Sequence, residues 1–323
     1  MMQDKIELLD IGLLDDKKKL KAIDHWLRVM GWSNGWHYDL DIIWILRQID
    51  ELGLRRGSTI IDAGAGLGVT QFILAARGYN VISLDFADRQ VPKYSKKIFT
   101  IEQAGNDLAG YTHEYMEFMD YSRNQGVKEK KAVGFSALLK KALDPKRFLL
   151  NIYTVSNLLN KYFNIGYTSE TTRDHRGFGK IIFLRGTFNN IPLGDNTADA
   201  LVSVSAFEHN TYDDMPSSIV EFTRVIKKNS PLLITTSAAE SKDWYFKPSK
   251  AWNFSKETLS AWFSIPNGNI VFNYHEVFKG IVGSSLLKKR IPWSYKLSGE
   301  NGLPYGKLDD AQYLPVGIVK TKR

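Results

Sequence analysis

The sequence predicts an α/β fold, built on a mostly parallel, seven-stranded sheet with helices on both faces. Short apolar runs without alternation recur along the chain, which is typical of strands that are buried on both faces of a parallel sheet. Amphipathic segments of helical period separate several of these runs. The chain has 323 residues, of which 43% are hydrophobic and 24% are charged. This composition is that of an ordinary globular protein with a sizeable core.

The first part of the chain, 1–57, is predicted to form a helical cap, because residues 15–53 carry helical periodicity. Its strongest signal is an apolar stripe at helical spacing that consists of Ile42, Ile45, Leu46, Ile49 and Leu52. The glycine and polar residues of 53–58 are expected to end this helix.

Seven strands are predicted at 59–61, 80–84, 180–184, 200–204, 231–236, 269–274 and 314–320. The last of them is expected to be antiparallel to the others. Helices are predicted at 69–77, 215–228 and 255–263. Together, 58–90 and 180–323 are expected to form the main domain.

An insertion is predicted between the second and third strands, at 91–179. About 95 residues separate these strands, whereas a crossover connection needs only about a dozen. Helical patterns at 134–142 and 148–162 make the insertion mainly helical. It carries about 15 Lys and Arg against about 9 Asp and Glu, and so most of the net charge of +8. It either packs on itself or forms a lid that shapes a ligand crevice.

Several classes of protein are excluded by what the sequence lacks. Without cysteine there are no disulfides, no thiolate metal sites and no cysteine nucleophile. No run approaches the roughly 18 to 20 apolar residues that cross a bilayer, and the mixed, acidic start is not a signal peptide. A cytoplasmic protein is therefore expected. No metal site is predicted, although the pair Asp195 and Asn196 leaves a magnesium site conceivable.

A glycine-rich loop follows the first strand of the main domain, at Asp62-Ala63-Gly64-Ala65-Gly66-Leu67-Gly68. Such a loop lets the backbone approach a ligand closely. The glycines follow the pattern G-x-G-x-G, whereas dinucleotide-binding loops follow G-x-G-x-x-G. Asp62 suits the amino group of a bound amino-acid moiety, and Asp85, at the end of the next strand, suits two ribose hydroxyls.

This loop resembles that of the class I S-adenosylmethionine-dependent methyltransferases, in particular a small-molecule group related to the ubiquinone and menaquinone methylases. The resemblance implies a Rossmann-like fold and S-adenosyl-L-methionine as cofactor. It implies that the loop binds the methionine part of the cofactor, that Asp85 binds its ribose and that Phe86 lies against its adenine. The implied cofactor-binding residues in this block are Asp62, Gly64, Ala65, Gly66, Gly68, Asp85 and Phe86.

A second block, at 186–193 and 199–209, is similar to another conserved pattern of the same family. The family's usual aspartate, which holds the adenine amino group, is replaced by Thr187, and a hydroxyl accepts hydrogen bonds more weakly than a carboxylate. Contacts from Thr187, Phe188 and Ser205 to the cofactor are implied by this block.

His209 is the candidate catalytic residue. It follows the fourth strand, where the donor methyl is expected to point, and an imidazole there suits deprotonation of a hydroxyl near neutral pH. Alternatively, the Glu208–His209 pair orders a loop. His37, in an aromatic turn, either folds over the cofactor or acceptor or staples the following helix. His113 and His175 are expected to be surface histidines.

Aromatic residues and lysines are mixed at 243–254. This segment is either a wall for a sugar or another polar ring, or local packing in which Trp252 and Phe254 belong to the core. The leading hypothesis is O-methylation of a small polar metabolite or glycan. The basic insertion makes RNA methylation an alternative, and a non-catalytic cofactor-binding subunit is another.

Overall fold

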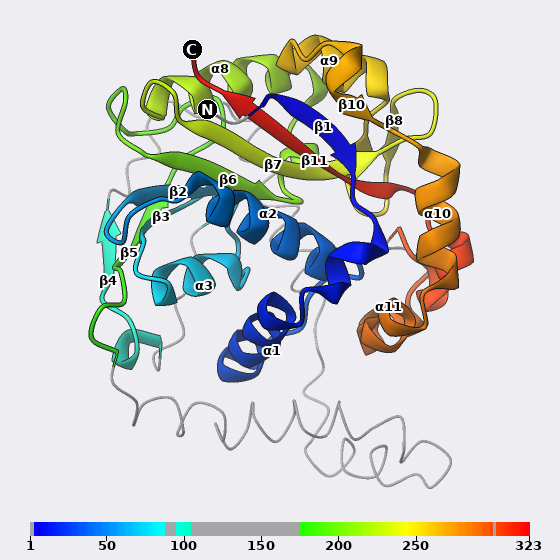
Figure 1. Ribbon diagram of the computed structural model, residues 1–323, viewed down its shortest axis with the longest axis horizontal. Helices are drawn as coiled ribbons and strands as arrows, with labels where there is room; N and C mark the ends of the chain where they lie inside the picture. Colours follow the sequence, from blue (N-terminus) through cyan, green and yellow to red (C-terminus); the bar gives the residue numbers. More distant parts are fainter. Residues whose placement is uncertain (1–2, 88–94, 105–174, 300–301) are drawn as a thin grey trace, which may run out of the picture.

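The computed structural model describes residues 3–87, 95–104, 175–299 and 302–323, and the colours of Figure 1 follow them along the chain. Within these ranges nine strands form one sheet, in the order β10-β1-β11-β7-β6-β2-β3-β5-β4. The strands are β1 (Lys5–Leu8), β2 (Thr59–Ala63), β3 (Asn80–Asp85), β4 (Ile101–Ala104), β5 (Ile181–Arg185), β6 (Ala200–Val204), β7 (Pro231–Ala238), β10 (Ile270–Val271) and β11 (Leu314–Thr321). A separate hairpin consists of β8 (Trp244–Phe246) and β9 (Ala251–Asn253).

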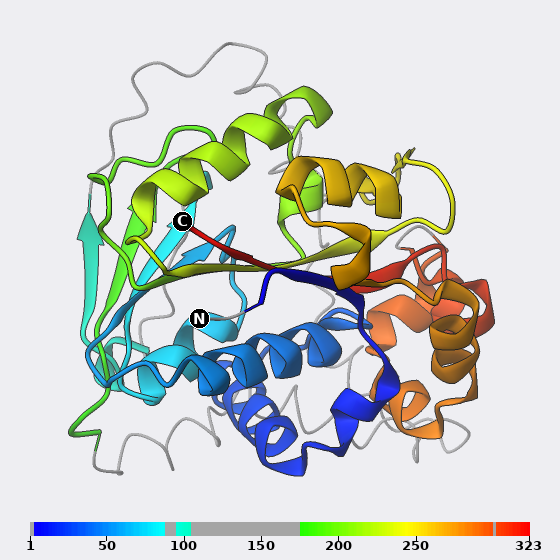
Figure 2. The same ribbon diagram turned by 45° about the horizontal axis from the view of Figure 1, so that its top comes forward.

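The predicted α/β fold is confirmed. Strands β4, β5, β3, β2, β6 and β7 pair in parallel, and β11 runs antiparallel between β7 and β1. The helices are α1 (Lys17–Met30), α2 (Tyr38–Leu52), α3 (Thr70–Ala76), α8 (Met215–Val225), α9 (Lys256–Phe263), α10 (Tyr274–Gly283), α11 (Ser285–Arg290) and α12 (Trp293–Leu297). Figure 2 shows α8 and α9 over one face of the sheet and α1, α2 and α3 over the other.

The sheet has two strands more than the predicted seven. Strand β1 lies in the range that was expected to be a helical cap; it buries Ile6 and pairs with β11, which is more than 300 residues away along the chain. Strand β4 lies in the range of the predicted insertion and is a half-polar edge strand. Neither short sequence carries an apolar run that would predict a strand. Each strand is paired by a partner that is distant along the chain.

One predicted strand is much shorter in the structure. The expected strand at 269–274 is reduced to β10, because α10 begins at Tyr274. The predicted helices at 134–142 and 148–162, and most of the predicted insertion with its basic residues, lie outside the described residues.

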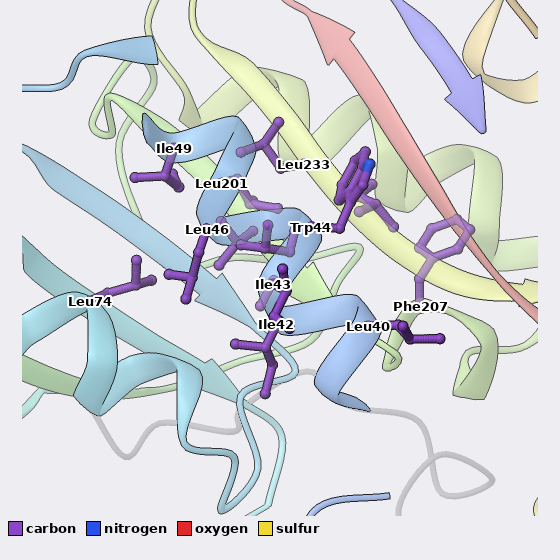
Figure 3. Packing of buried hydrophobic residues seen from close by; sticks show 14 of the residues in the cluster. Leu40, Ile42, Ile43, Trp44, Leu46, Ile49, Leu74, Leu201, Phe207 and Leu233 are labelled. Carbon is purple, nitrogen blue, oxygen red and sulfur yellow. The ribbon is translucent and has the colours of Figure 1, made fainter. Parts of the chain in front are cut away.

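Helix α2 fills the centre of the core. Figure 3 shows its apolar side chains packing toward Leu201 of β6 and Leu233 of β7. Trp44 lies so close to β11 that a Cβ atom on Gly317 would stand 2.5 Å from its ring. Ten of the fifteen residues of α2 are buried, which is more than the single stripe that the sequence indicated. None of the helices in the described ranges is both long and apolar enough to span a membrane.

Candidate functional site

The carboxyl ends of the parallel strands define the candidate site. Strand β2 lies between β6 and β3, and the chain proceeds from it to β3 and β5 on one side and to β7 through β6 on the other. Ligands of open α/β sheets bind in the crevice where the strand order reverses in this way. The loops that follow β2, β3, β5 and β6 all carry residues predicted from the sequence.

The glycine loop approaches two other loops so closely that Gly64 cannot carry a side chain. Its φ of +73° lies in the left-handed region, and a Cβ atom there would stand 2.5 Å from the Cβ of Ala206 and 2.8 Å from the ring of Phe188. The amides of Gly64 and Ala65 both donate to the Leu84 carbonyl, at 2.9 and 3.1 Å. The structure therefore brings the two predicted cofactor blocks into contact.

Gln71, a residue that the sequence did not single out, holds the glycine loop in place through hydrogen bonds to two of its carbonyls. It lies in the first turns of α3, is buried, and donates to the Gly68 carbonyl at 2.8 Å and the Gly66 carbonyl at 3.4 Å. Its own side-chain oxygen accepts a hydrogen bond from Ser83 at 2.7 Å. Glutamine is common in helices, so only its buried position could have indicated this role.

Replacing Gln71 by leucine is expected to loosen the loop. The change keeps the size of the side chain but leaves the Gly68 carbonyl and the Ser83 hydroxyl without this partner. Such losses cost about 1–3 kcal/mol of folding free energy for each buried group. Urea unfolding measures this cost, and a Gln71→Leu variant as stable as the wild type would contradict the assigned role.

Asp85 is fixed at the end of β3 by two backbone amides. Its Oδ2 accepts from the Gly66 amide at 2.7 Å and its Oδ1 from the Ala87 amide at 2.8 Å. Each carboxylate oxygen can accept a further hydrogen bond. Asp62 is also buried, in register with Ser83 of β3 and Val202 of β6. Phe86 is half-buried, and its carbonyl accepts from Arg185 at 3.0 Å.

The second predicted block lies beside the glycine loop. Thr187 is buried and donates through its hydroxyl to the Oδ1 of Asn189 at 2.8 Å. Phe188 packs its ring edge against Phe222 of α8, with 5.2 Å between the ring centroids. Asn189 is exposed and its amide was not considered from the sequence.

Glu208 and His209, which are adjacent in the sequence, have opposite environments. The buried Glu208 accepts from Ser205 at 2.6 Å and from Thr236 at 3.0 Å, so it orders the loop after β6. His209 is exposed, and its Nδ1 lies 3.0 Å from the Lys250 carbonyl. Since a carbonyl only accepts, Nδ1 carries the proton and Nε2 is the basic nitrogen.

His37 is a core residue in a buried polar network. Its Nδ1 lies 2.5 Å from Asp41 Oδ2 and its Nε2 lies 3.3 Å from the Tyr313 hydroxyl. Burial raises the pKa of Asp41, and the neighbouring His37 opposes this rise. Asp41 and Tyr313 were not singled out from the sequence, although the spacing of four residues between His37 and Asp41 places them on one helical face.

The other residues considered from the sequence lie in several different parts of the fold. His175 precedes β5 and packs against Phe178. It therefore lies at the amino ends of the parallel strands, whereas the glycine loop lies at their carboxyl ends. His113 lies outside the described residues. Phe254 belongs to the core, whereas Trp252 is half-buried and packs against Tyr212. Asp195 accepts a hydrogen bond from Arg224 at 2.7 Å.

A model of one protein family, described as a methyltransferase domain, matches residues 163–234. In the described part of the chain this match spans β5, β6 and α8, and therefore the second cofactor block. Over these residues the chain is therefore similar to a methyltransferase domain. The glycine loop lies outside the matched range, and its geometry is an independent observation of the structure.

Solved structures are similar to the chain at low sequence identity. The YcgJ protein from Bacillus subtilis is 14% identical, with 86% of this chain and 98% of that chain covered and a TM-score of 0.36. A 1,6-didemethyltoxoflavin-N1-methyltransferase from Burkholderia thailandensis is 10% identical, with 96% and 84% covered and a TM-score of 0.40. A SAM-dependent methyltransferase from Aquifex aeolicus is 16% identical, with 78% and 82% covered and a TM-score of 0.35. No curated protein sequence matches the chain significantly.

Proposed function

We propose that this methyltransferase methylates a hydroxyl oxygen of a small polar metabolite or of a glycan. The observation that carries the proposal is the position of His209. It follows β6 at the carboxyl ends of the parallel strands, where the glycine loop also lies. Because Nδ1 is engaged in a hydrogen bond with the Lys250 carbonyl, the basic nitrogen is Nε2. An imidazole in that state can accept the proton of an attacking hydroxyl.

The loops at this edge fit S-adenosylmethionine. Gly64 and Gly66 both have positive φ, so the loop presents backbone rather than side chains. A Cβ atom on Gly66 would meet nothing closer than Asp85 Oδ2 at 4.0 Å, which leaves space above this glycine. In this assignment the glycine loop and Asp62 hold the methionine part, Asp85 the ribose, and Phe86, Thr187 and Phe188 the adenine. Ser205 orders the loop that carries His209. When bound, the cofactor supplies an electrophilic methyl group.

The chain's own residues then position the acceptor and move its proton. Methyl transfer would be a displacement at the donor's methyl group, so positioning of the acceptor by the chain's residues would supply most of the rate. The role of His209 would be to accept the hydroxyl proton on Nε2. The resulting imidazolium keeps its Nδ1–H directed at the Lys250 carbonyl.

Replacing Asp85 by alanine is expected to weaken cofactor binding by about 10- to 100-fold. The change removes the acceptor of the ribose hydroxyls and also the partner of the Gly66 amide, and hydrogen bonds to a charged group contribute about 1.5–3 kcal/mol. Isothermal titration calorimetry with S-adenosylhomocysteine measures this loss. Equal affinity of variant and wild type would contradict the assignment of Asp85.

Replacing His209 by glutamine is expected to lower kcat by about 100-fold and to leave cofactor affinity unchanged, because a general base acts on the chemical step. Transfer from radiolabelled donor to the best acceptor of a panel of polar metabolites and sugars measures this effect. His175→Gln, at the opposite sheet edge, is the matched control. Full activity of His209→Gln would show that His209 is not the general base.

The same screen tests RNA as the acceptor. The basic residues of 91–180 favour RNA on charge alone, and binding through phosphates weakens steeply as salt rises. Transfer to RNA that falls with added salt, together with no transfer to small polar acceptors, would replace the proposed substrate class.

A further inference from the structure

A pocket of about 440 Å³ lies at the carboxyl end of β7, apart from the glycine loop. Its lining includes Glu240, Lys242, Trp244, Tyr274, Phe278 and Gln312. Small-molecule sites have volumes of roughly 300–1,000 Å³, so the pocket has room for a metabolite or one sugar unit.

The pocket lies at the same sheet edge as the cofactor loops. Ala239 of its lining follows β7 directly, and β11 starts at this edge because Leu314 pairs with Ala238. In Figure 1, β8 and α10 border the same end of β7. Strand β7 also carries Thr236, which holds Glu208 in the loop after β6. The pocket is thus one strand away from the loop that carries His209.

The β8–β9 hairpin joins the pocket to His209. Trp244 in β8 lines the pocket, and Lys250, in the turn between the two strands, offers its carbonyl to the His209 ring. The hairpin is anchored by Asp243, which accepts from the Ser255 amide at 2.6 Å and from Thr258 at 2.7 Å. A ligand in the pocket therefore lies against the element that orients the proposed base.

Three aromatic rings and several polar groups line the pocket together. Trp244 is half-buried and packs edge-to-face against Phe246, with 5.6 Å between the ring centroids, and Tyr274 and Phe278 are half-buried on α10. Burial and the charge of Glu240 raise the pKa of Tyr274 to about 12, so its phenol remains a hydrogen-bond donor at neutral pH. Fixed aromatic faces beside hydrogen-bonding groups suit a ring with an apolar face and polar edges.

Lys242 is the one lysine among the residues that line the pocket, and Glu240 is the one carboxylate. The carboxylate of the neighbouring Asp243 accepts hydrogen bonds from Tyr212, Ser255 and Thr258. The Oε1 of Glu240 lies 3.3 Å from the Nε2 of His275. In the described part of the chain no carboxylate pairs with Lys242. This ammonium group is available to a ligand oxygen, and it would bind a carboxylate more strongly than a hydroxyl.

We propose that this pocket is a saccharide-binding subsite of the methyl acceptor, in which Trp244 stacks on the sugar ring and Lys242 binds an acidic substituent. The inference rests on the proposed function, because it names the acceptor's class. It makes a uronic acid a better ligand than the neutral hexose of the same configuration.

Saturation-transfer NMR on the full chain, with S-adenosylhomocysteine present, tests the proposal using glucose and glucuronic acid as probes. We expect both sugars to bind, with glucuronic acid about tenfold tighter, since one charge-assisted hydrogen bond contributes about that factor. Lys242→Ala should abolish the preference for glucuronic acid, and Trp244→Ala should weaken both sugars by about tenfold. Lys247→Ala, an exposed lysine of the same hairpin outside the pocket, is the matched control.

Calorimetry with S-adenosylhomocysteine on each variant separates this proposal from the function. Unchanged cofactor affinity shows that the variants are folded. No binding of either sugar to the wild type, or equal binding to wild type and Lys242→Ala and Trp244→Ala, would overturn the saccharide subsite while the methyltransferase function stands. Sugar binding without cofactor binding would instead contradict the cofactor assignment.

Discussion

Replacing Gly64 by alanine is expected to abolish cofactor binding and to destabilise the fold. A residue other than glycine in the left-handed region costs about 1–2 kcal/mol. The added methyl group would also meet Ala206 at 2.5 Å, and overpacking of this kind costs about 1–3 kcal/mol more. Because Ala206 belongs to the loop after β6, relief of this collision displaces the glycine loop or the loop that carries His209.

Gly53 offers a matched control for this change. It ends α2 with a φ of +60°, and a Cβ atom there would meet nothing within 4 Å. Gly53→Ala should therefore show the backbone cost alone, about 1 kcal/mol in urea unfolding, with full cofactor affinity. If Gly64→Ala bound S-adenosylhomocysteine as tightly as Gly53→Ala, the glycine loop would not be the part of the chain that binds the cofactor.

Replacing His37 by leucine is expected to cost about 1–3 kcal/mol of folding free energy, since it leaves the buried Asp41 without its hydrogen-bond partner. The loss should depend on pH. Burial already raises the pKa of Asp41 above its usual value of 3.8, and His37 opposes this rise. A raised pKa contributes stability that is present below the unfolded value and is lost as the pH rises through the native value. Without His37 that native value rises further, so the cost should be larger at about pH 8 than at about pH 5.

The double variant His37→Leu with Asp41→Leu checks this reasoning. Replacing both partners of a buried polar pair by apolar side chains can be nearly neutral, so the double variant should be more stable than His37→Leu and show less pH dependence. Urea unfolding at the two pH values measures both effects. A single variant with a small, pH-independent loss would mean that Asp41 is paired by other groups.

The parts of the fold that depend on local pattern were predictable from the sequence. The strand from Ala200 to Val204 appears with its predicted limits, and Ser255 caps α9 as the predicted start of that helix indicated. The spacing of the glycine loop and the acid at Asp85 predicted the segments that meet at the carboxyl edge of the sheet. Each of these features follows from a short stretch of sequence.

The rest depends on contacts between distant residues. Gln71 could not be distinguished from any other helical glutamine until α3 was placed under the loop. Tyr313 contacts His37 across 276 residues, and β1 pairs with a strand near the other end of the chain. Trp244 is one of several aromatics in its segment, and only the fold distinguishes it from the buried Phe254.

Calorimetric titration of the chain with S-adenosylhomocysteine is the most direct test of the central claim, that the loop from Asp62 to Gly68 binds the methyl donor's framework. We expect one binding site per chain, which Gly64→Ala loses and Gly53→Ala keeps. No binding to the wild type, or binding that Gly64→Ala leaves unchanged, would contradict the claim.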